Sequence, residues 1–245
     1  MRINLPAAAA ALLAACALGA AAPAGAAGVC DVRFLRDGGE VRLTGTGAIK
    51  LDADLSFSDV RKSGPDTCRA HVRGNATYQL LGLPGGDSDF DHDMRVVDGK
   101  STFARRGRQA EAGKSFDLRL LGLFGYPGRR LQEGARLPGE TFQLSLGERG
   151  RRGSLDMPAA VVRIGEKTVG KRQAMDTALG RQQCWPVSYQ RNTDPTMATF
   201  GSVTLPIPGM RSDVTDWFCP DAGLVMKQEI VQAGQQAVIE VTSVK

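Results

Sequence analysis

The sequence contains few of the residues on which most catalytic and metal sites depend. Of its 245 residues only two are histidines and 6% are aromatic. No C-x-x-C pair occurs, and neither histidine is spaced with cysteines as zinc ligands require. No G-x-S-x-G motif is present, so neither a serine nor a cysteine triad has support. We therefore expect a chain that is not an enzyme, holds no metal and needs no cofactor.

Long apolar runs are also scarce. Beyond the N-terminal leader no run approaches the roughly 20 residues that a membrane-spanning helix needs. The formal net charge is +5, which suits an anionic surface or simply solubility. The basic and aromatic residues form no motif of the kind that nucleic-acid-binding domains use, so we expect no nucleic-acid partner.

The N-terminus has the features of an export signal, which we place at residues 1–27. Arg2 precedes an apolar stretch at 5–15, and small residues follow. Two processing routes remain open. Residues 24–26 fit the small-x-small rule for signal peptidase, whereas 13–16 resemble a lipobox in which Cys16 would be acylated and serve as a membrane tether. Either route places the chain in the periplasm or anchors it by lipid in the bacterial envelope.

Four further cysteines indicate disulfides, because an even count in an oxidising compartment is typical of them. They are Cys30, Cys68, Cys184 and Cys219. Three connectivities are possible. We predict Cys30–Cys68 and Cys184–Cys219, since each pair closes a local loop worth about 4 kcal/mol of chain entropy.

Residues 41–57 and 68–80 alternate between apolar or small side chains and polar ones. This period of two predicts two long strands, each with one dry and one wet face, joined by turn residues at 62–66. A half-solvated face is an antiparallel trait. A strand of 17 residues would measure about 56 Å, so we expect it to bend at Gly45 and Gly47.

Short alternating runs continue to the C-terminus, and no long helical pattern occurs. The glycine- and arginine-rich segment 147–153 is interpreted as a loop between an N-terminal β half at 28–146 and a C-terminal β half at 154–245. We predict a mainly β protein of curved antiparallel sheets, a half-barrel or part-barrel with few or no long helices and two disulfides. Whether the halves share one sheet is left open.

Five aspartates follow a calcium-loop spacing, at Asp87, Asp89, Asp91, Asp93 and Asp98. The loop's sharp turn requires glycine where this chain has His92, and its last ligand is normally glutamate, not aspartate. We therefore predict a solvated acidic loop without a metal.

Two segments of the C-terminal third resemble a family. Residues 184–189 read CWPVSY, and residues 215–229 read TDWFCPDAGLVMKQE. The second resembles the "WYAPGVGLVKQE" signature of exported β-rich envelope families of unknown function. These families are similar to lipoprotein-carrier half-barrels, and the likeness covers about 165–244. It implies an envelope location, a strand-turn-strand at this segment and a concave apolar face, and it brings no catalytic residues. The chain departs from the signature at Cys219, where the family has alanine.

The dry face of the long hairpin is the predicted ligand site. Its bulky residues are Ile49, Leu51, Leu55, Phe57, Val72 and Tyr78. We expect a non-catalytic periplasmic or outer-envelope protein that binds an apolar small molecule, a lipid or a lipidated partner on a concave β face. The alternative is a structural or assembly factor that contacts other envelope proteins. If the face is covered by the rest of the chain, these residues are core.

Overall fold

The computed structural model describes residues 28–80, 86–98, 100–106, 126, 131–150, 153–200 and 202–245. The predicted leader and Cys16 lie outside these residues. Within them the chain forms strands and one short 3₁₀ helix, η1 (Val29–Asp31). No helix of the described part is long and apolar enough to span a membrane.

The strands are numbered in the order of the chain. Their bounds are β1 (Gly39–Gly47), β2 (Ile49–Gly64), β3 (Thr67–Leu80), β4 (Gly86–Val97), β5 (Lys100–Arg105), β6 (Arg136–Leu137), β7 (Glu140–Gly150), β8 (Gly153–Ile164), β9 (Lys167–Val169), β10 (Gln173–Thr177), β11 (Gly180–Thr193), β12 (Thr196–Phe200), β13 (Val203–Ile207), β14 (Met210–Cys219), β15 (Leu224–Gln232) and β16 (Gln235–Val244).

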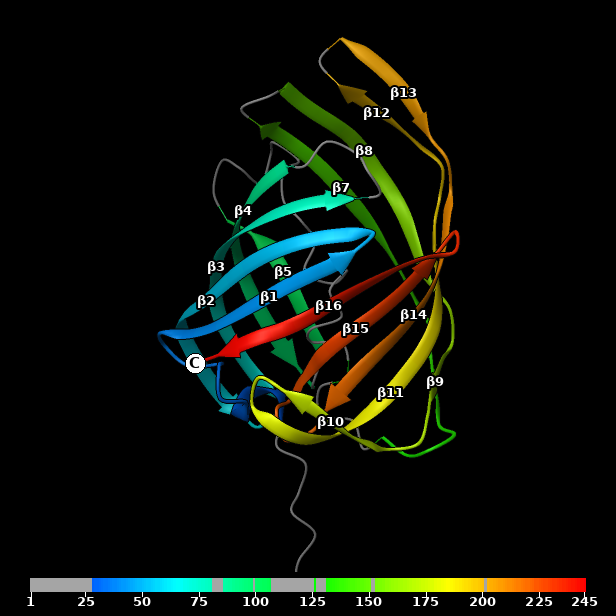
Figure 1. The fold of residues 1–245 in the computed structure, drawn as a ribbon. Helices are drawn as coiled ribbons and strands as arrows, with labels where there is room; N and C mark the ends of the chain where they lie inside the picture. Colours follow the sequence, from blue (N-terminus) through cyan, green and yellow to red (C-terminus); the bar gives the residue numbers. More distant parts are fainter. Residues whose placement is uncertain are drawn as a thin grey trace, which may run out of the picture.

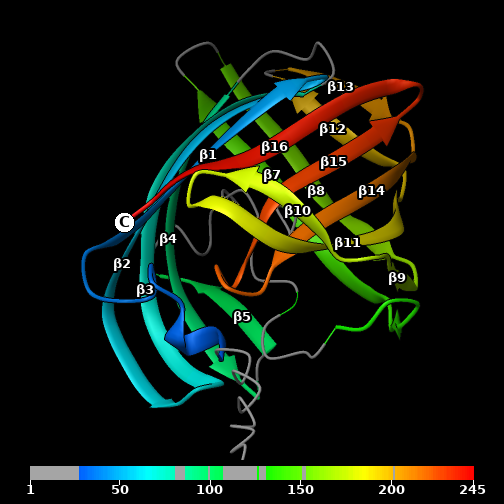
Figure 2. The ribbon, with the colours of Figure 1, turned by 60° about the horizontal axis from the view of Figure 1, so that its bottom comes forward.

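All these strands belong to one antiparallel sheet. Its main path runs β13-β12-β8-β11-β14-β15-β16-β1-β2-β3-β4-β5, with β6, β7, β9 and β10 attached at the sides. β1 pairs with β16, so the first and last strands of the described residues lie side by side in the interior of the sheet. The sheet curls strongly, as sheets of twisted strands do, and forms a half-barrel that is not closed (Figures 1 and 2). The predicted fold class is confirmed.

The predicted 17-residue strand is wrong in one respect, because it is a hairpin. β1 and β2 reverse direction around Ala48, and Gly47 adopts φ +82°, a left-handed conformation that favours glycine. Gly45 faces Leu51 across the turn, so odd-numbered residues stay on one side of the sheet before and after it. The alternation therefore continues unbroken through a reversal of the chain.

The segment 147–153 is not a loop between two halves. β7 continues to Gly150, β8 begins at Gly153 and these two glycines pair, so the described residues of the segment belong to paired strands. The pairing of these two strands crosses the expected division, and the sheet continues on both sides of it.

The predicted acidic loop is instead strand β4, which pairs with β3 along its whole length. Its aspartates alternate along one face and meet complementary side chains of β3. Thr77 donates to Asp87 at 2.8 Å, and Arg73 lies 3.9 Å from Asp91. Cross-strand pairing accounts for the alternation of these aspartates.

Both predicted disulfides, Cys30–Cys68 and Cys184–Cys219, are confirmed. The first ties the segment before β1 to the start of β3. The second joins β11 to β14 beside the Trp185–Phe218 pair.

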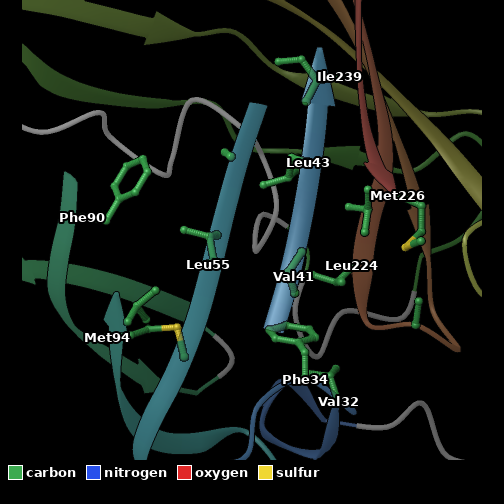
Figure 3. Close-up of a cluster of buried hydrophobic side chains, with 14 of the residues drawn as sticks. Val32, Phe34, Val41, Leu43, Leu55, Phe90, Met94, Leu224, Met226 and Ile239 are labelled. Atoms are coloured by element: carbon green, nitrogen blue, oxygen red, sulfur yellow. The ribbon is translucent and has the colours of Figure 1, made fainter. Parts of the chain in front are cut away.

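The main core lies inside the curl of the sheet. Figure 3 shows Phe90 and Met94 of β4 on one side and Leu224 and Met226 of β15 on the other, with Val41 and Leu43 of β1 and Leu55 of β2 between them. Val32 and Phe34 enter from the segment after η1, and the ring of Phe34 lies 5.1 Å from that of Phe57. A second apolar cluster includes Val169, Val187, Phe218 and Val225.

Candidate functional site

The predicted ligand residues all lie on the inner, concave face of the sheet, but they divide into two groups. Leu55, Phe57 and Val72 are at most 2% exposed and belong to the main core. Leu51 and Tyr78 are also buried, at 5% and 6%, and Ile49 is only partly buried. The second group lies at the β1–β2 turn end of the hairpin, and the first lies deeper.

Leu51 and Tyr78 belong to a line of inward-facing residues that crosses seven strands, which we name the Gln228 row. Each member faces the next across a strand pair, because residues directly opposite in an antiparallel ladder point to the same side. The row runs Val187, Asp216, Gln228, Ile239, Gly45, Leu51, Tyr78. It connects the predicted ligand residues with a group of buried polar side chains at the opposite end.

These polar side chains form the polar cluster, which consists of Tyr126, Lys167, Tyr189, Asp216 and Gln228. The Tyr126 hydroxyl donates to Oδ2 of Asp216 at 2.8 Å, and Nε2 of Gln228 donates to Oδ1 at 2.8 Å. Nζ of Lys167 lies 5.1 Å and 5.2 Å from the ring centroids of Tyr126 and Tyr189. All five side chains are buried. The cluster lies between the two apolar clusters on one continuous face.

Burial controls the acid–base behaviour of this cluster. Desolvation raises the pKa of the Asp216 carboxyl, although hydrogen bonds from Gln228 and Tyr126 and the charge of Lys167 oppose the rise. Desolvation, followed by the nearby Asp216 charge, raises the pKa of both Tyr126 and Tyr189 well above the usual value. Lys167 also pairs with Oε1 of the half-exposed Glu140, at 3.1 Å.

One atom of the cluster is not satisfied. Gln228 is 1% exposed, and its Oε1 has no hydrogen-bond partner among the described residues. An unpaired buried acceptor costs about 1–3 kcal/mol, so proteins rarely retain one without a reason. The acceptor lies on the concave face, one position along the row from Ile239.

A second polar group lies on the outer, convex face around His71. Nε2 of His71 lies 2.6 Å from Oδ1 of Asp91, and Nη1 of Arg106 lies 3.0 Å from Nδ1. Because the guanidinium can only donate, Nδ1 accepts and Nε2–H donates to Asp91. Arg106 also pairs with Asp93 at 2.8 Å. His71 is 3% exposed although the alternation places it on the polar face.

In the part of the chain that the structure describes, no group of three or more His, Cys, Asp or Glu side chains is placed to hold a metal ion. The six predicted ligand residues share one face, as expected. The sequence analysis missed Lys167, Asp216 and Gln228. Asp216 carried a signal, because it stands between Val214 and Phe218 at an inward position of an alternating strand.

No protein-family model matches the chain, and no curated protein matches it. Similar solved structures include a protein of Bacteroides fragilis assigned as exported, with a YmcC-like fold. It shares 12% identity, with a TM-score of 0.44, over 85% of this chain and 96% of that chain. Another is a protein of Parabacteroides distasonis assigned as a lipoprotein, which shares 12% identity, with a TM-score of 0.47, over 87% of this chain and 99% of that chain. Both the identities and the TM-scores are too low to transfer a function.

The predicted family signature stays a prediction. The local structure that it implied is nevertheless present: β14 ends at Cys219, residues 220–223 turn, and β15 begins at Leu224. On the convex side of this hairpin, Nε1 of Trp217 donates to Oε2 of Glu229 at 3.0 Å, and Nζ of Lys227 lies 4.9 Å from the Trp217 ring.

Proposed function

We propose that this chain is an exported, non-catalytic protein of the bacterial envelope, periplasmic or lipid-anchored, that binds an amphiphilic molecule on the concave face of its half-barrel. The amphiphile is a lipid, an apolar small molecule with one polar group, or the lipid of a lipidated partner. The predicted leader and the two disulfides support export, because disulfides persist in oxidising compartments.

The observation that carries the binding proposal is the open acceptor of Gln228. Ligand sites are mostly apolar and contain a few convergent polar groups. Oε1 of Gln228 lies at the border of two apolar clusters and lacks a donor among the described residues. A hydroxyl, amide or ammonium group of a ligand would supply that donor and remove the desolvation cost.

The Gln228 row supplies the apolar part of the proposed site. From Gln228 it continues over Ile239 and the side-chain-free Gly45 to Leu51 and Tyr78. Partly buried Ile49 packs beside this end of the row. An acyl chain lying along the row would meet these side chains while its polar end reached Gln228.

The geometry around His71 supports a non-catalytic role. A His–Asp pair acts as a general base through the ring nitrogen that does not contact the carboxylate. In this chain that nitrogen, Nδ1, accepts from Arg106. Nδ1 is therefore occupied by the Arg106 guanidinium and has no free lone pair with which to take a proton.

The test is native mass spectrometry of the protein, expressed from its full-length sequence and purified from the envelope without detergent. We expect the wild-type protein to retain a lipid-sized adduct. Gln228→Leu removes the acceptor and keeps a similar volume, so it should lose most of that adduct while remaining folded. Ser212→Ala is the matched control, because Ser212 is another buried polar residue of the concave face, outside the polar cluster.

Two results would contradict the proposal. The first is a wild-type protein that carries no adduct and takes up none from added phospholipid. The second is an adduct that survives Gln228→Leu at the level of Ser212→Ala, which would show that the polar cluster only stabilises the fold.

A second candidate function, assembly through protein contacts, is favoured by strand β13. It forms one edge of the sheet and exposes Val203 at 53% and Leu205 at 48%. Unpaired edges accept an extended segment of another protein. A photo-crosslinking residue at position 205 should then give one discrete protein adduct in cells, and the same residue at the exposed Val231 should not. Equal adducts at both positions would contradict this function.

A further inference from the structure

Three arginines stand side by side on the convex face of the sheet. Arg61 of β2 faces Arg69 of β3, and Arg69 faces Arg95 of β4. We call this line the arginine ladder. β2, β3 and β4 lie side by side as long, curved strands (Figure 2). Arg69 and Arg95 alternate with buried residues of the concave face, so the ladder lies on the outside of the half-barrel.

The ladder is electrostatically unusual. Like charges directly opposite on neighbouring strands destabilise a sheet. Nearby arginines avoid this arrangement: Arg42 pairs with Asp54 at 3.1 Å, and Arg106 pairs with Asp93 at 2.8 Å. Within the described ranges, the three ladder arginines have neither an ion pair nor a side-chain hydrogen bond. Three positive charges thus stand together, and none of them is ion-paired with a described residue.

The ladder also lines a hollow. A cleft of about 940 Å³ is bounded by Arg61, Arg69 and Arg95 together with Ser63 and Thr67. Guanidinium groups donate hydrogen bonds only, and hydroxyls donate readily, so this part of the wall suits an oxyanion. Asp59 and Asp93 also line the cleft; Asp93 is held by Arg106, and Asp59 lies 4.0 Å from Nδ1 of His71.

We propose that the arginine ladder is a binding site for a phosphate group, either of a soluble phosphate compound or of a phospholipid headgroup. Planar guanidinium groups match phosphate oxygens in pairs, which favours phosphate over a single-point anion. A bound phosphate would neutralise the repulsion between Arg69 and its two neighbours. The site lies on the opposite face from the Gln228 row and does not depend on it.

The central variant is Arg69→Gln, and the matched control is Arg42→Gln, which removes one exposed arginine of the same face outside the cleft. Without anion, Arg69→Gln should melt about 1–3 °C above wild type, because like-charge repulsion is relieved. Arg42→Gln should melt at or slightly below wild type, because an attractive pair is lost.

Binding is measured by calorimetry with inorganic pyrophosphate and by sedimentation with phosphatidylglycerol vesicles against phosphatidylcholine vesicles. We expect Arg69→Gln to raise the Kd of the probe that binds by at least about tenfold, as loss of a charge-assisted hydrogen bond implies. Arg42→Gln should leave that Kd unchanged. Pyrophosphate binding identifies a soluble ligand. Binding only to the anionic vesicles identifies a headgroup. Binding to neither probe, or equal weakening by both variants, would overturn the proposal.

Discussion

Leu55→Ala separates a filled core from an open cradle on the concave face. Leu55 is 2% exposed, and it faces Val41 on one side and Gly74 on the other. Gly74 has no side chain that could fill the space left by the truncation. Its backbone also lies too close to its neighbour for a side chain, since a Cβ there would lie 1.9 Å from the carbonyl oxygen of Asp54. We therefore expect the hole left by truncation to collapse little.

The expected loss follows from two contributions. Removing three buried methylene-sized groups costs about 2.4 kcal/mol in transfer free energy. A residual cavity of about 70 Å³ adds about 1.7 kcal/mol at roughly 24 cal/mol per Å³. The free energy of unfolding should therefore fall by about 4 kcal/mol, in the upper part of the range for leucine truncation.

The assay is urea denaturation followed by circular dichroism, with both disulfides intact. Leu205→Ala on the edge strand is the control, because Leu205 is 48% exposed and its truncation should cost less than about 0.5 kcal/mol. A loss at Leu55 below about 1 kcal/mol would refute the reasoning. It would mean that the deep half of the predicted ligand set lines an open cradle.

Two further predictions concern charge and turn geometry. Because burial raises the pKa of Asp216 in the folded state, its contribution to stability is full below the unfolded pKa of about 3.9 and is lost as the pH rises through the folded pKa. The stability of wild type minus that of Asp216→Asn should thus fall in urea titrations as the pH rises above about 4, and a rise would contradict this. Gly223 and Gly234 have φ +68° and +76°, but a Cβ at Gly223 would lie 1.9 Å from Cγ1 of Val32, whereas one at Gly234 meets open space. Gly234→Ala should cost about 1–2 kcal/mol and Gly223→Ala clearly more; equal losses in melting experiments would contradict the role of Val32.

Alternation along the chain was enough to predict which side chains face inward. Every predicted ligand residue lies on the concave face. A hairpin with Gly45 opposite Leu51 keeps the odd residues of β1 and β2 on one side, and Tyr78 and Val72 of β3 lie opposite Leu51 and Phe57. For the same reason alternation could not reveal the reversal at Ala48. A period of two does not change at a turn after which odd-numbered residues still face the same side of the sheet.

Burial on the polar face was not predictable from the pattern. His71 alternates with the inward-facing Ala70 and Val72, so the pattern places it on the polar face. It is buried because Asp91 of the neighbouring strand β4 contacts one ring nitrogen and Arg106 covers the other. Both partners depend on strand pairings that no local pattern specifies.

The position of Gln228 shows most clearly where the sequence stops being informative. The tight hairpin between β14 and β15 pairs Cys219 with Leu224 and Phe218 with Val225. Continued without interruption, that register would place Lys227 opposite Asp216. A β-bulge at Trp217/Phe218 shifts the register by one residue, so Asp216 faces Gln228 instead, and Lys227 faces Trp217 on the convex side. One extra residue thus exchanges a charged group for a neutral amide at the buried position. The position of Gln228, whose Oε1 lacks a partner among the described residues, is a consequence of that bulge. Nothing in the residues 215–229 taken alone distinguishes the two registers.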